Sequence, residues 1–208
     1  MADYTFFTNP MSRGQIARWA LHEAGANYDQ VIVSWTDKPP AFLAANPMGK
    51  VPTIIHHAGS ADRVVTECAA ICAYLAEMHP QAGLLPEDKE KADYLRWLFF
   101  AAGPVESAVV SRSLKFEPEA GQEVMAGWGS FDRTMATLES HFEGNNFVCG
   151  NRFTMADVYV GSQVDWGLTF GTIPPREAFV AYAERLQARE AYKPAKAVDN
   201  KLIEAMRQ

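Results

Sequence analysis

The pattern of secondary structure changes near residue 80, and this change constrains the fold more than any other feature of the sequence. Before it, short runs of β-type residues alternate with stretches of helical periodicity. After it, every periodic segment is helical. The chain has 208 residues, and a typical domain has about 150, so two small domains of different class are possible. We therefore expect an α/β domain followed by an all-helical one.

The part before residue 80 predicts a small α/β layer in the order strand, helix, strand, strand, strand, helix. Strands are expected at 4–8, 28–34, 51–57 and 63–66, and helices at 12–24 and 67–78. The stretch between the second and third strands holds Pro39, Pro40 and Pro47 and is expected to be irregular. We place this α/β domain at residues 1–79.

The second part begins after a linker at residues 80–88, which holds two prolines and one glycine. From residue 89 to 208 we expect an all-helical domain. One apolar stripe is interrupted by Gly103 and Pro104, where a kink is expected because proline lacks the N–H of the helical hydrogen bond. Another stripe runs from Val124 to Phe142 and predicts one long amphipathic helix.

The strongest local signal in the helical part is the segment from Thr154 to Asp157. Thr154 has the side chain of a helix N-cap, and a carboxylate three residues later can accept from the backbone N–H of the cap. We therefore expect a capping box here, with a role in folding rather than in chemistry.

Charge and cysteine content narrow the classes of function. The 19 basic and 25 acidic residues give a net charge of −6, so the chain has no general attraction for nucleic acid or anionic lipid. The longest apolar stretch, 98–105, is far shorter than the ~18 residues of a membrane span, and the N-terminus lacks the pattern of a secretory signal. Cys68, Cys72 and Cys149 form no CxxC pair, which favours reduced thiols over disulfides or zinc. We expect a cytoplasmic protein with no metal, no membrane partner and no nucleic-acid partner.

Chemistry is expected first at residues 9–14, where a strand turns directly into a helix. Ser12 fits an N-cap, because its hydroxyl can accept one of the unpaired N–H groups of the first helical turn. The same helix end presents free N–H groups and a positive dipole end, which suit an anion or a thiolate. Asn9, Ser12 and Arg13 can all donate to such a ligand, and the residues alone leave both interpretations open.

Two further segments contain unusual turns. At residues 46–53, a turn leads into a strand with Pro52 at its second position, which indicates an edge, a bulge or a cis turn, with trans as the default. At residues 64–69, a strand runs straight into a helix that starts with Glu67 and Cys68. Ligands of open α/β sheets bind at such strand exits, so these segments are candidates for one shared site.

Together these segments resemble the cytosolic glutathione transferases. The strand leading into Ser12, the run NPMGKVP at 46–52, the run TECAAI at 66–71 and the run GNRFTMAD at 150–157 fit that family along essentially the whole chain. The resemblance implies a thioredoxin-like N-terminal domain and an all-helical C-terminal domain. It also implies glutathione as co-substrate and a homodimer as the assembly.

The resemblance implies roles for single residues. Pro52 would be a cis proline, and the backbone of Val51 would pair with the cysteinyl part of glutathione. Glu67 and Cys68 would bind the γ-glutamyl end. Cys68 replaces the commoner serine, and its S–H is a weaker donor, while its backbone N–H remains available in principle.

For the catalytic position, the family uses tyrosine, serine or cysteine near the end of the first strand. Phe7 occupies the tyrosine place, and no cysteine precedes residue 68. The resemblance therefore implies Ser12 as the residue that stabilises the glutathione thiolate. Asn9, also expected to bind glutathione, and Arg13 are the alternatives.

Other binding residues follow from the resemblance with less direct support. Lys38 and Lys50 are the candidates for the glycyl carboxylate. The hydrophobic substrate would lie between the domains. Its candidate contacts are Trp35, Phe100, Pro104, Phe116 and Trp166, for each of which core packing is the favoured expectation.

The expected function is conjugation of the glutathione thiolate to a hydrophobic electrophile, a detoxification reaction. One alternative is a specialised glutathione-dependent ether cleavage, dehalogenation or isomerisation. Another is a non-catalytic, partner-binding relative resembling the stringent starvation proteins. The joint presence of Ser12, Pro52 and Glu67 argues against the non-catalytic alternative, because a pure binding module does not need them together.

Overall fold

The computed structural model describes residues 2–59 and 61–207, and the chain forms two compact units. The first unit consists of Met1–Leu85 and Ala188–Gln208, and the second of Pro86–Gln187. The expected division placed everything after residue 88 in one helical domain. The structure differs because the C-terminal segment returns to the first unit, where it packs on the first helix. Apolar periodicity shows which face of a helix is buried but not which partner buries it.

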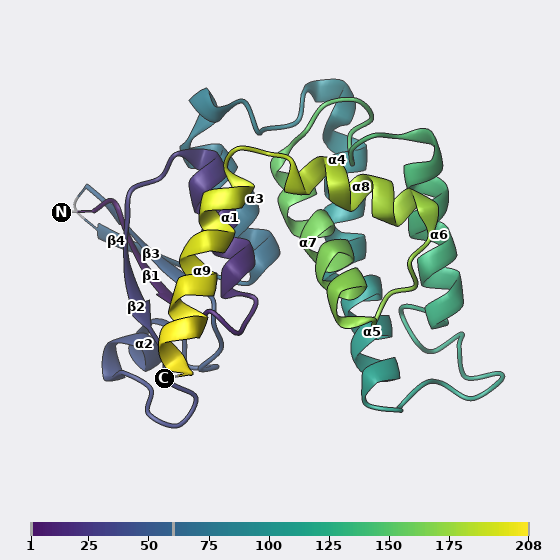
Figure 1. The fold of residues 1–208 in the computed structure, drawn as a ribbon, viewed down its shortest axis with the longest axis horizontal. Helices are drawn as coiled ribbons and strands as arrows, with labels where there is room; N and C mark the ends of the chain where they lie inside the picture. The colour runs from purple at the N-terminus through teal and green to yellow at the C-terminus, as the bar shows by residue number, and fades with distance from the viewer. Residues whose placement is uncertain (1, 60, 208) are drawn as a thin grey trace. The chain divides into compact units, whose positions relative to one another are not determined.

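The first unit is built on a four-stranded mixed sheet with the order β2-β1-β3-β4 (Figure 1). The strands are β1 (Tyr4–Thr8), β2 (Tyr28–Ile32), β3 (Thr53–Ala58) and β4 (Ala61–Thr66). β1 runs parallel to β2 and antiparallel to β3, and β3 runs antiparallel to β4. All four predicted strands are confirmed, and β1 has the predicted bounds.

The helices of the first unit are α1 (Gly14–Ala24), α2 (Pro40–Ala45), α3 (Cys68–Met78) and α9 (Tyr192–Met206), with a 3₁₀ turn η1 (Pro80–Ala82) after α3. The expectation of an irregular stretch over 35–50 is wrong for α2. A proline is a good first residue of a helix, because its missing N–H has no intrahelical partner there. Pro40 therefore starts this short helix instead of preventing it.

The two faces of the sheet pack against different helices. Phe6 lies under α1, with the guanidinium of Arg18 5.3 Å from its ring centre. The next residue, Phe7, points to the opposite face and packs with Val33 and with Phe42 of α2. This alternation is the period of two that a β-strand imposes. Phe7, at the expected tyrosine position, is thus a core residue.

Helices α1 and α9 lie side by side and are joined by polar and aromatic contacts (Figure 1). Arg18 Nε donates to Asp199 Oδ1 at 2.9 Å, and both side chains are fully buried. Glu23 of α1 receives two hydrogen bonds from Arg189, at 2.6 and 2.7 Å. A buried, hydrogen-bonded ion pair is costly to break from one side, so α9 is firmly held on α1.

The second unit is helical in its described residues, apart from loops and one isolated β-bridge between Phe147 and Gly150. Its elements are η2 (Asp88–Glu90), α4 (Lys91–Phe100), η3 (Ala101–Val105), α5 (Glu106–Ser113), α6 (Phe131–Gly144), α7 (Met155–Phe170) and α8 (Glu177–Gln187). The interruption expected at Gly103 and Pro104 is confirmed, because η3 is a π-helical segment between α4 and α5. None of the helices in the described ranges combines the length and hydropathy of a membrane span.

The long helix expected to start near Val124 is shorter than predicted. α6 begins at Phe131, and Val124 is 93% exposed. Gly127 and Gly129 precede the helix, and Gly129 has φ +67°, which ends any helical run there. Ser130 then caps α6, its hydroxyl accepting from the Arg133 N–H at 3.3 Å. The apolar stripe continued by chance through a glycine-rich loop.

The predicted capping box at the start of α7 is present, and Asp157 is its centre. Asp157 Oδ2 accepts from the backbone N–H and hydroxyl of Thr154, at 2.8 and 3.1 Å. Oδ1 accepts from the Val148 N–H at 2.7 Å and from the Tyr182 hydroxyl at 2.9 Å. Burial raises the pKa of the Asp157 carboxyl to about 6, and these hydrogen bonds oppose the rise. One carboxylate therefore joins the loop before α7, its first turn and α8.

Replacing this carboxylate should destabilise the protein. Asp157→Ala leaves four buried donors without their acceptor, and we expect the free energy of unfolding to fall by about 3 kcal/mol. Asp132→Ala is the matched control, because Asp132 also lies in a first helical turn but its side chain is exposed. It should cost less than about 1 kcal/mol. Urea unfolding of both variants measures this, and equal losses would contradict the assignment.

Candidate active site

Three junctions between strands and turns lie at one edge of the sheet. Thr53 at the start of β3 pairs with Phe7 of β1 on one side and with Thr66 of β4 on the other. Because β3 is antiparallel to both neighbours, β1 and β4 end where β3 begins. The segments around residues 12, 52 and 67, which the sequence singled out separately, therefore meet at this edge.

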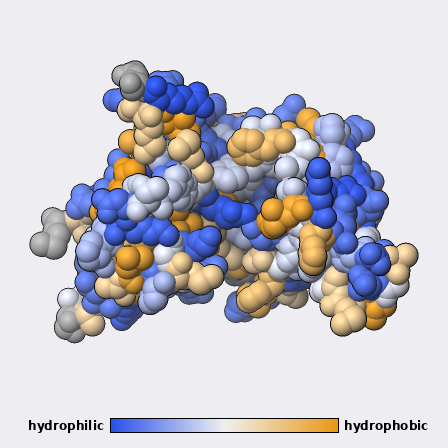
Figure 2. All heavy atoms as spheres, turned by 90° about the horizontal axis from the view of Figure 1, so that it is seen from below, coloured by the Kyte–Doolittle hydropathy of each residue, from blue (hydrophilic) through white to orange (hydrophobic). Residues whose placement is uncertain are grey.

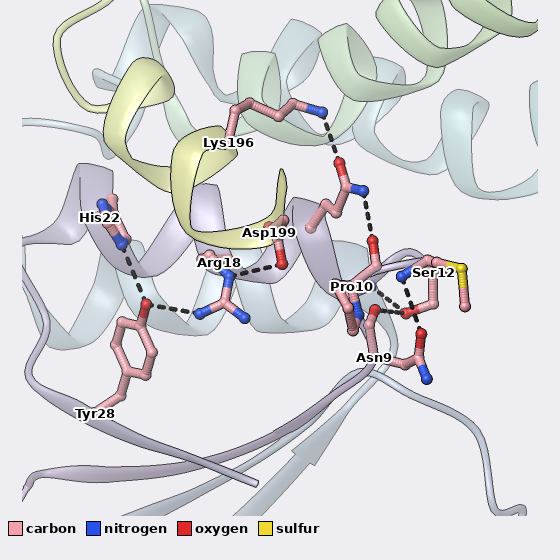
Figure 3. A network of polar contacts seen from close by, with 11 residues as sticks. Asn9, Pro10, Ser12, Arg18, His22, Tyr28, Lys196 and Asp199 are labelled. Carbon is pink, nitrogen blue, oxygen red and sulfur yellow. Dashed lines mark hydrogen bonds and ion pairs between the residues drawn. The ribbon is translucent and has the colours of Figure 1, made fainter. Parts of the chain in front are cut away.

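Residues 9–13, which we call the Ser12 turn, are held by the side chain of Asn9 (Figure 3). Asn9 is 3% exposed, and its Nδ2 donates to the Val33 carbonyl at 2.9 Å. Its Oδ1 accepts from the Met11 N–H at 2.9 Å. Asn9 thus ties the turn to the segment after β2, which is a structural role. Direct contact between Asn9 and a ligand stays a prediction.

The hydroxyl of Ser12 is engaged on both sides. It donates to the Asn9 carbonyl at 2.6 Å and accepts from the Gly14 N–H at 2.9 Å. A hydroxyl has one proton, so Ser12 can donate to a ligand only by turning away from Asn9. The backbone N–H of Ser12 has no hydrogen-bond partner within residues 2–59 and 61–207. The turn therefore offers two donors from one residue, of which only the backbone N–H is free.

Gly14 allows the helix to start directly behind the strand. A Cβ atom on Gly14 would lie 2.0 Å from the hydroxyl oxygen of Thr8, the last residue of β1. Real Cβ atoms do not approach other atoms so closely, so no larger side chain fits without movement. The absence of a side chain brings the N-terminus of α1, with its positive dipole end, to the sheet edge.

The second junction is organised by Asn46, which is buried. Its Nδ2 donates to the Lys50 carbonyl at 2.9 Å and to the Thr53 hydroxyl at 3.1 Å. Its Oδ1 accepts from the Met48 N–H at 3.1 Å. Asn46 thus fixes the shape of the whole turn before β3.

This turn presents the backbone of Val51 without a partner. The Val51–Pro52 peptide is cis, as the resemblance implies. Val51 precedes β3, and neither its N–H nor its carbonyl bonds to any residue that the structure describes. One free donor and one free acceptor on the backbone of the half-buried Val51 suit an extended, peptide-like ligand.

The third junction is the start of α3. Glu67 has φ +65°, a left-handed conformation that is uncommon for a residue with a side chain. Such strain is found where the surrounding structure uses it, most often at binding sites. Glu67 is exposed, and no side chain caps the first turn of α3. The carboxylate can therefore bind a cation, and the start of α3 beside it can bind an anion.

Cys68 connects the third junction to the first. Its thiol lies 3.6 Å from the Arg13 carbonyl, in the geometry of a weak S–H donor. Cys68 is nearly buried and begins α3, so its thiol is turned toward α1 while its backbone lies at the open helix end. This places Cys68 between the two helix starts.

The two lysines expected at the site differ in their surroundings. Lys38 is half-buried, and its ammonium donates to the Gly49 carbonyl at 2.9 Å, which places it beside the second junction. Lys50 is exposed, and its ammonium has no partner among the described residues. Both can supply positive charge at this side of the turn.

Comparison with known proteins identifies the fold and the family. The N-terminal domain model of the glutathione S-transferases matches residues 11–78, and their C-terminal domain model matches residues 107–166, together more than half of the chain. The chain belongs to the glutathione S-transferase family. This family of enzymes has the architecture found here, a thioredoxin-like domain with a four-stranded sheet and an all-helical domain.

Similar proteins cover nearly the whole chain. A glutathione transferase of Methylococcus capsulatus has a solved structure with a TM-score of 0.77, at 27% identity, over 95% of this chain and 98% of that one. The structure of a sphingomonad glutathione S-transferase complexed with glutathione has a TM-score of 0.75, at 28% identity, over 94% and 98%. Glutathione S-transferase GstA of Escherichia coli O157:H7 is 23% identical over 190 residues, 88% of this chain and 92% of its own.

Sequence reasoning found the three junctions of this glutathione S-transferase but missed the side chains that hold them. Asn46 and Thr53 lie in the unusual turn at 46–53 that the sequence indicated, but the sequence assigned no role to either side chain. Gln15 and Lys196 were not noted, yet they form a hydrogen-bonded chain to the Ser12 turn (Figure 3). For Asn46 and Thr53, an asparagine three residues before a glycine in a turn is a usable signal. No local signal connects residues 181 positions apart.

The five candidate contacts for a hydrophobic substrate are not core residues. Trp35 and Phe116 are 53% and 79% exposed, and the other three are half-buried. The expectation that each packs in the core is therefore wrong. Within the described part of the chain, no three His, Cys, Asp or Glu side chains are grouped as a metal site.

The close approach at Gly14 gives a direct test. Gly14→Ala must displace the Thr8 hydroxyl, α1 or the end of β1, so we expect a loss of about 1–3 kcal/mol in unfolding free energy and a loss of glutathione binding. Gly144→Ala at the end of α6 is the control, because nothing lies within 4 Å of its Cβ position. Thermal unfolding and calorimetry compare the two. If Gly14→Ala were as stable as Gly144→Ala, the close packing would be refuted.

Proposed function

We propose that the protein binds glutathione at the sheet edge of the first unit and conjugates the glutathione thiolate to a hydrophobic electrophile. The Ser12 turn faces the sulfur, Val51 pairs with the cysteinyl backbone, and Glu67 and Cys68 receive the γ-glutamyl end. The single observation that carries this proposal is the meeting of two helix starts and one unpaired backbone segment at one sheet edge.

The chemistry of glutathione fits these groups. Its cysteinyl unit has one backbone N–H and one carbonyl, which match the free carbonyl and N–H of Val51. Its γ-glutamyl unit carries an ammonium and a carboxylate, which match the Glu67 carboxylate and the open start of α3. Its glycyl carboxylate can be met by Lys38 or Lys50. The solved sphingomonad relative is a complex with glutathione, which supports the assignment of the ligand.

The reaction requires the thiol to be ionised. A free thiol of this type has a pKa near ~8.5, so only a few per cent is thiolate at neutral pH. Donors at the Ser12 turn and the positive end of α1 stabilise the anion, and each unit of pKa depression corresponds to ~1.4 kcal/mol. The thiolate then forms a bond to an electrophilic carbon. In a substitution, the leaving group departs with the bonding electron pair and the thiol proton goes to solvent.

The proposal extends to assembly and location. We expect a homodimer that acts on hydrophobic electrophiles in the cytoplasm, in a detoxification role. Leu95 and Phe99 support a homodimer, because they expose apolar side chains one turn apart on α4. On the face shown in Figure 2, hydrophobic residues form small patches among hydrophilic ones.

Ser12→Ala tests the catalytic assignment. We expect kcat with a chromogenic aryl halide to fall about 100-fold, with little change in glutathione affinity, because the lost donor acts on developing negative charge. The pKa of bound glutathione, followed by thiolate absorbance, should rise by about one to two units. The parent protein must also bind immobilised glutathione, and failure to bind would overturn the function.

The control for this variant is Ser130→Ala, which removes the N-cap of α6 and so costs the same kind of hydrogen bond. Both variants should lose about 1 kcal/mol of stability. Only Ser12→Ala should change turnover and the thiol pKa. The structure places the N-cap of α1 at Arg13 rather than at the expected Ser12. If Ser12→Ala kept the parental kcat, the Ser12 hydroxyl would serve only to hold the turn through its bonds to Asn9 and Gly14.

Cys68→Ser tests the γ-glutamyl end. A hydroxyl is a stronger donor than a thiol, so we expect the Kd for glutathione to fall about threefold to tenfold. Cys149→Ser in the second unit is the control and should leave the Kd unchanged. Calorimetric titration measures both. A higher Kd in Cys68→Ser would show that the thiol packs on α1 and does not contact the ligand.

A further inference from the structure

A chain of polar contacts connects the C-terminal helix to the Ser12 turn (Figure 3). Lys196 Nζ of α9 donates to Gln15 Oε1 of α1 at 2.9 Å. Gln15 Nε2 in turn donates to the Pro10 carbonyl at 2.6 Å. Both helices belong to the first unit, so these contacts lie within one compact body.

The Pro10 carbonyl is half of a peptide group that is held at both ends. The N–H of the same peptide belongs to Met11, and it donates to Asn9 Oδ1 at 2.9 Å. With the carbonyl held by Gln15, this peptide plane cannot rotate without losing one of the two bonds. The next N–H along the chain is that of Ser12, the unpartnered donor of the turn. The direction of that donor depends on the peptide plane before it.

The contact with Lys196 strengthens the hydrogen bond that Gln15 donates to the Pro10 carbonyl. Lys196 is half-buried, and its ammonium lies 5.3 Å from the ring centre of Tyr192. A cation at the amide oxygen polarises the amide, which makes its N–H a better donor to Pro10. Asp199, one turn further along α9, is held by Arg18, so the helix that carries Lys196 is itself fixed on α1.

We propose that Lys196 and Gln15 are positioning residues of the glutathione site, through which α9 holds the Ser12 turn in the geometry that meets the sulfur. The inference rests on the proposed function, since it assigns a task to that turn. It adds Lys196, a residue of the C-terminal helix α9, to the residues that shape the site. Lys196 and Gln15 act on the sulfur only through the peptide of Pro10 and Met11.

A positioning role predicts a specific set of variant effects. Lys196→Met removes the charge at nearly equal length, and Gln15→Met removes both bonds. Gln15→Glu keeps an acceptor for Lys196 but has no N–H for Pro10, so it should behave like Gln15→Met. Lys196→Arg retains a donor and should restore the parental behaviour. Lys193→Met is the control, because Lys193 is an exposed lysine of the same helix.

The first measurement is independent of glutathione. Hydrogen exchange of the peptide covering residues 10–14, read by mass spectrometry in the free protein, should be about fivefold faster in Gln15→Met and Lys196→Met than in the parent. Lys193→Met and Lys196→Arg should match the parent. Unchanged exchange in Lys196→Met would overturn the inference, whether or not the protein binds glutathione.

The second measurement is made with glutathione. We expect kcat/KM to fall about tenfold in Gln15→Met and about threefold in Lys196→Met, with the bound thiol pKa raised and the melting temperature within about 2 °C of the parent. The double variant should be no worse than Gln15→Met, because both side chains act through one bond. A changed melting temperature with an unchanged thiol pKa and kcat/KM would overturn the inference in favour of a purely structural contact. A parent that fails to bind glutathione overturns the function instead, and this is seen before any variant is compared.

Discussion

The site depends on the pairing of β3 with a neighbour on each side. Because Thr53 is in register with both Phe7 and Thr66, one residue sets where β1 ends, where β3 begins and where β4 ends. A shift of one residue in either ladder would turn every side chain of that strand to the opposite face. The buried Phe6 and Phe7 forbid such a shift, since they pack on opposite faces of the sheet. Core packing therefore aligns the three junctions before any ligand is present.

At the first and second junctions, a buried side-chain amide forms hydrogen bonds with the backbone of the turn and leaves other backbone groups unpaired among the described residues. Asn9 and Asn46 perform the same task in two different turns, each with one donor and one acceptor contact to nearby main chain. Their burial makes these bonds costly to lose. Val51 and Ser12 are left with unpaired backbone groups as a consequence. The free polar groups at these two turns are thus largely main-chain atoms, and buried side chains position them.

Much of this arrangement was predictable from local sequence, because strands, helix starts and turn residues have short-range signals. The strand at residues 4–8, the capping box at Thr154 and the break at Pro104 were all found in this way. Two local errors have local causes. Pro40 was taken as a breaker where it starts a helix, and the apolar stripe from Val124 crossed a glycine loop. Neither error touched the site.

The features that could not be predicted are long-range. The pairing of Arg18 with Asp199 and of Gln15 with Lys196 joins positions that only the folded chain brings together. The residues alone also left the cis or trans state of Pro52 open, and only the family resemblance indicated cis. The position of the Ser12 hydroxyl is a further case. The hydrogen bond from this hydroxyl to the Asn9 carbonyl depends on a turn geometry that no residue type dictates by itself.

The return of residues 188–208 to the first unit has a consequence for how the protein is made. The chain starts this unit, leaves it for about a hundred residues and then comes back, so the second unit is in effect an insertion within the first. During synthesis, the helical insertion can collapse while the sheet still lacks its last helix, because domains fold as units from the N-terminal side. Until α9 has emerged from the ribosome, the α1 face around Arg18 lacks the Asp199 carboxylate that pairs with its guanidinium. The first unit is therefore completed late in translation, although its four strands are made first.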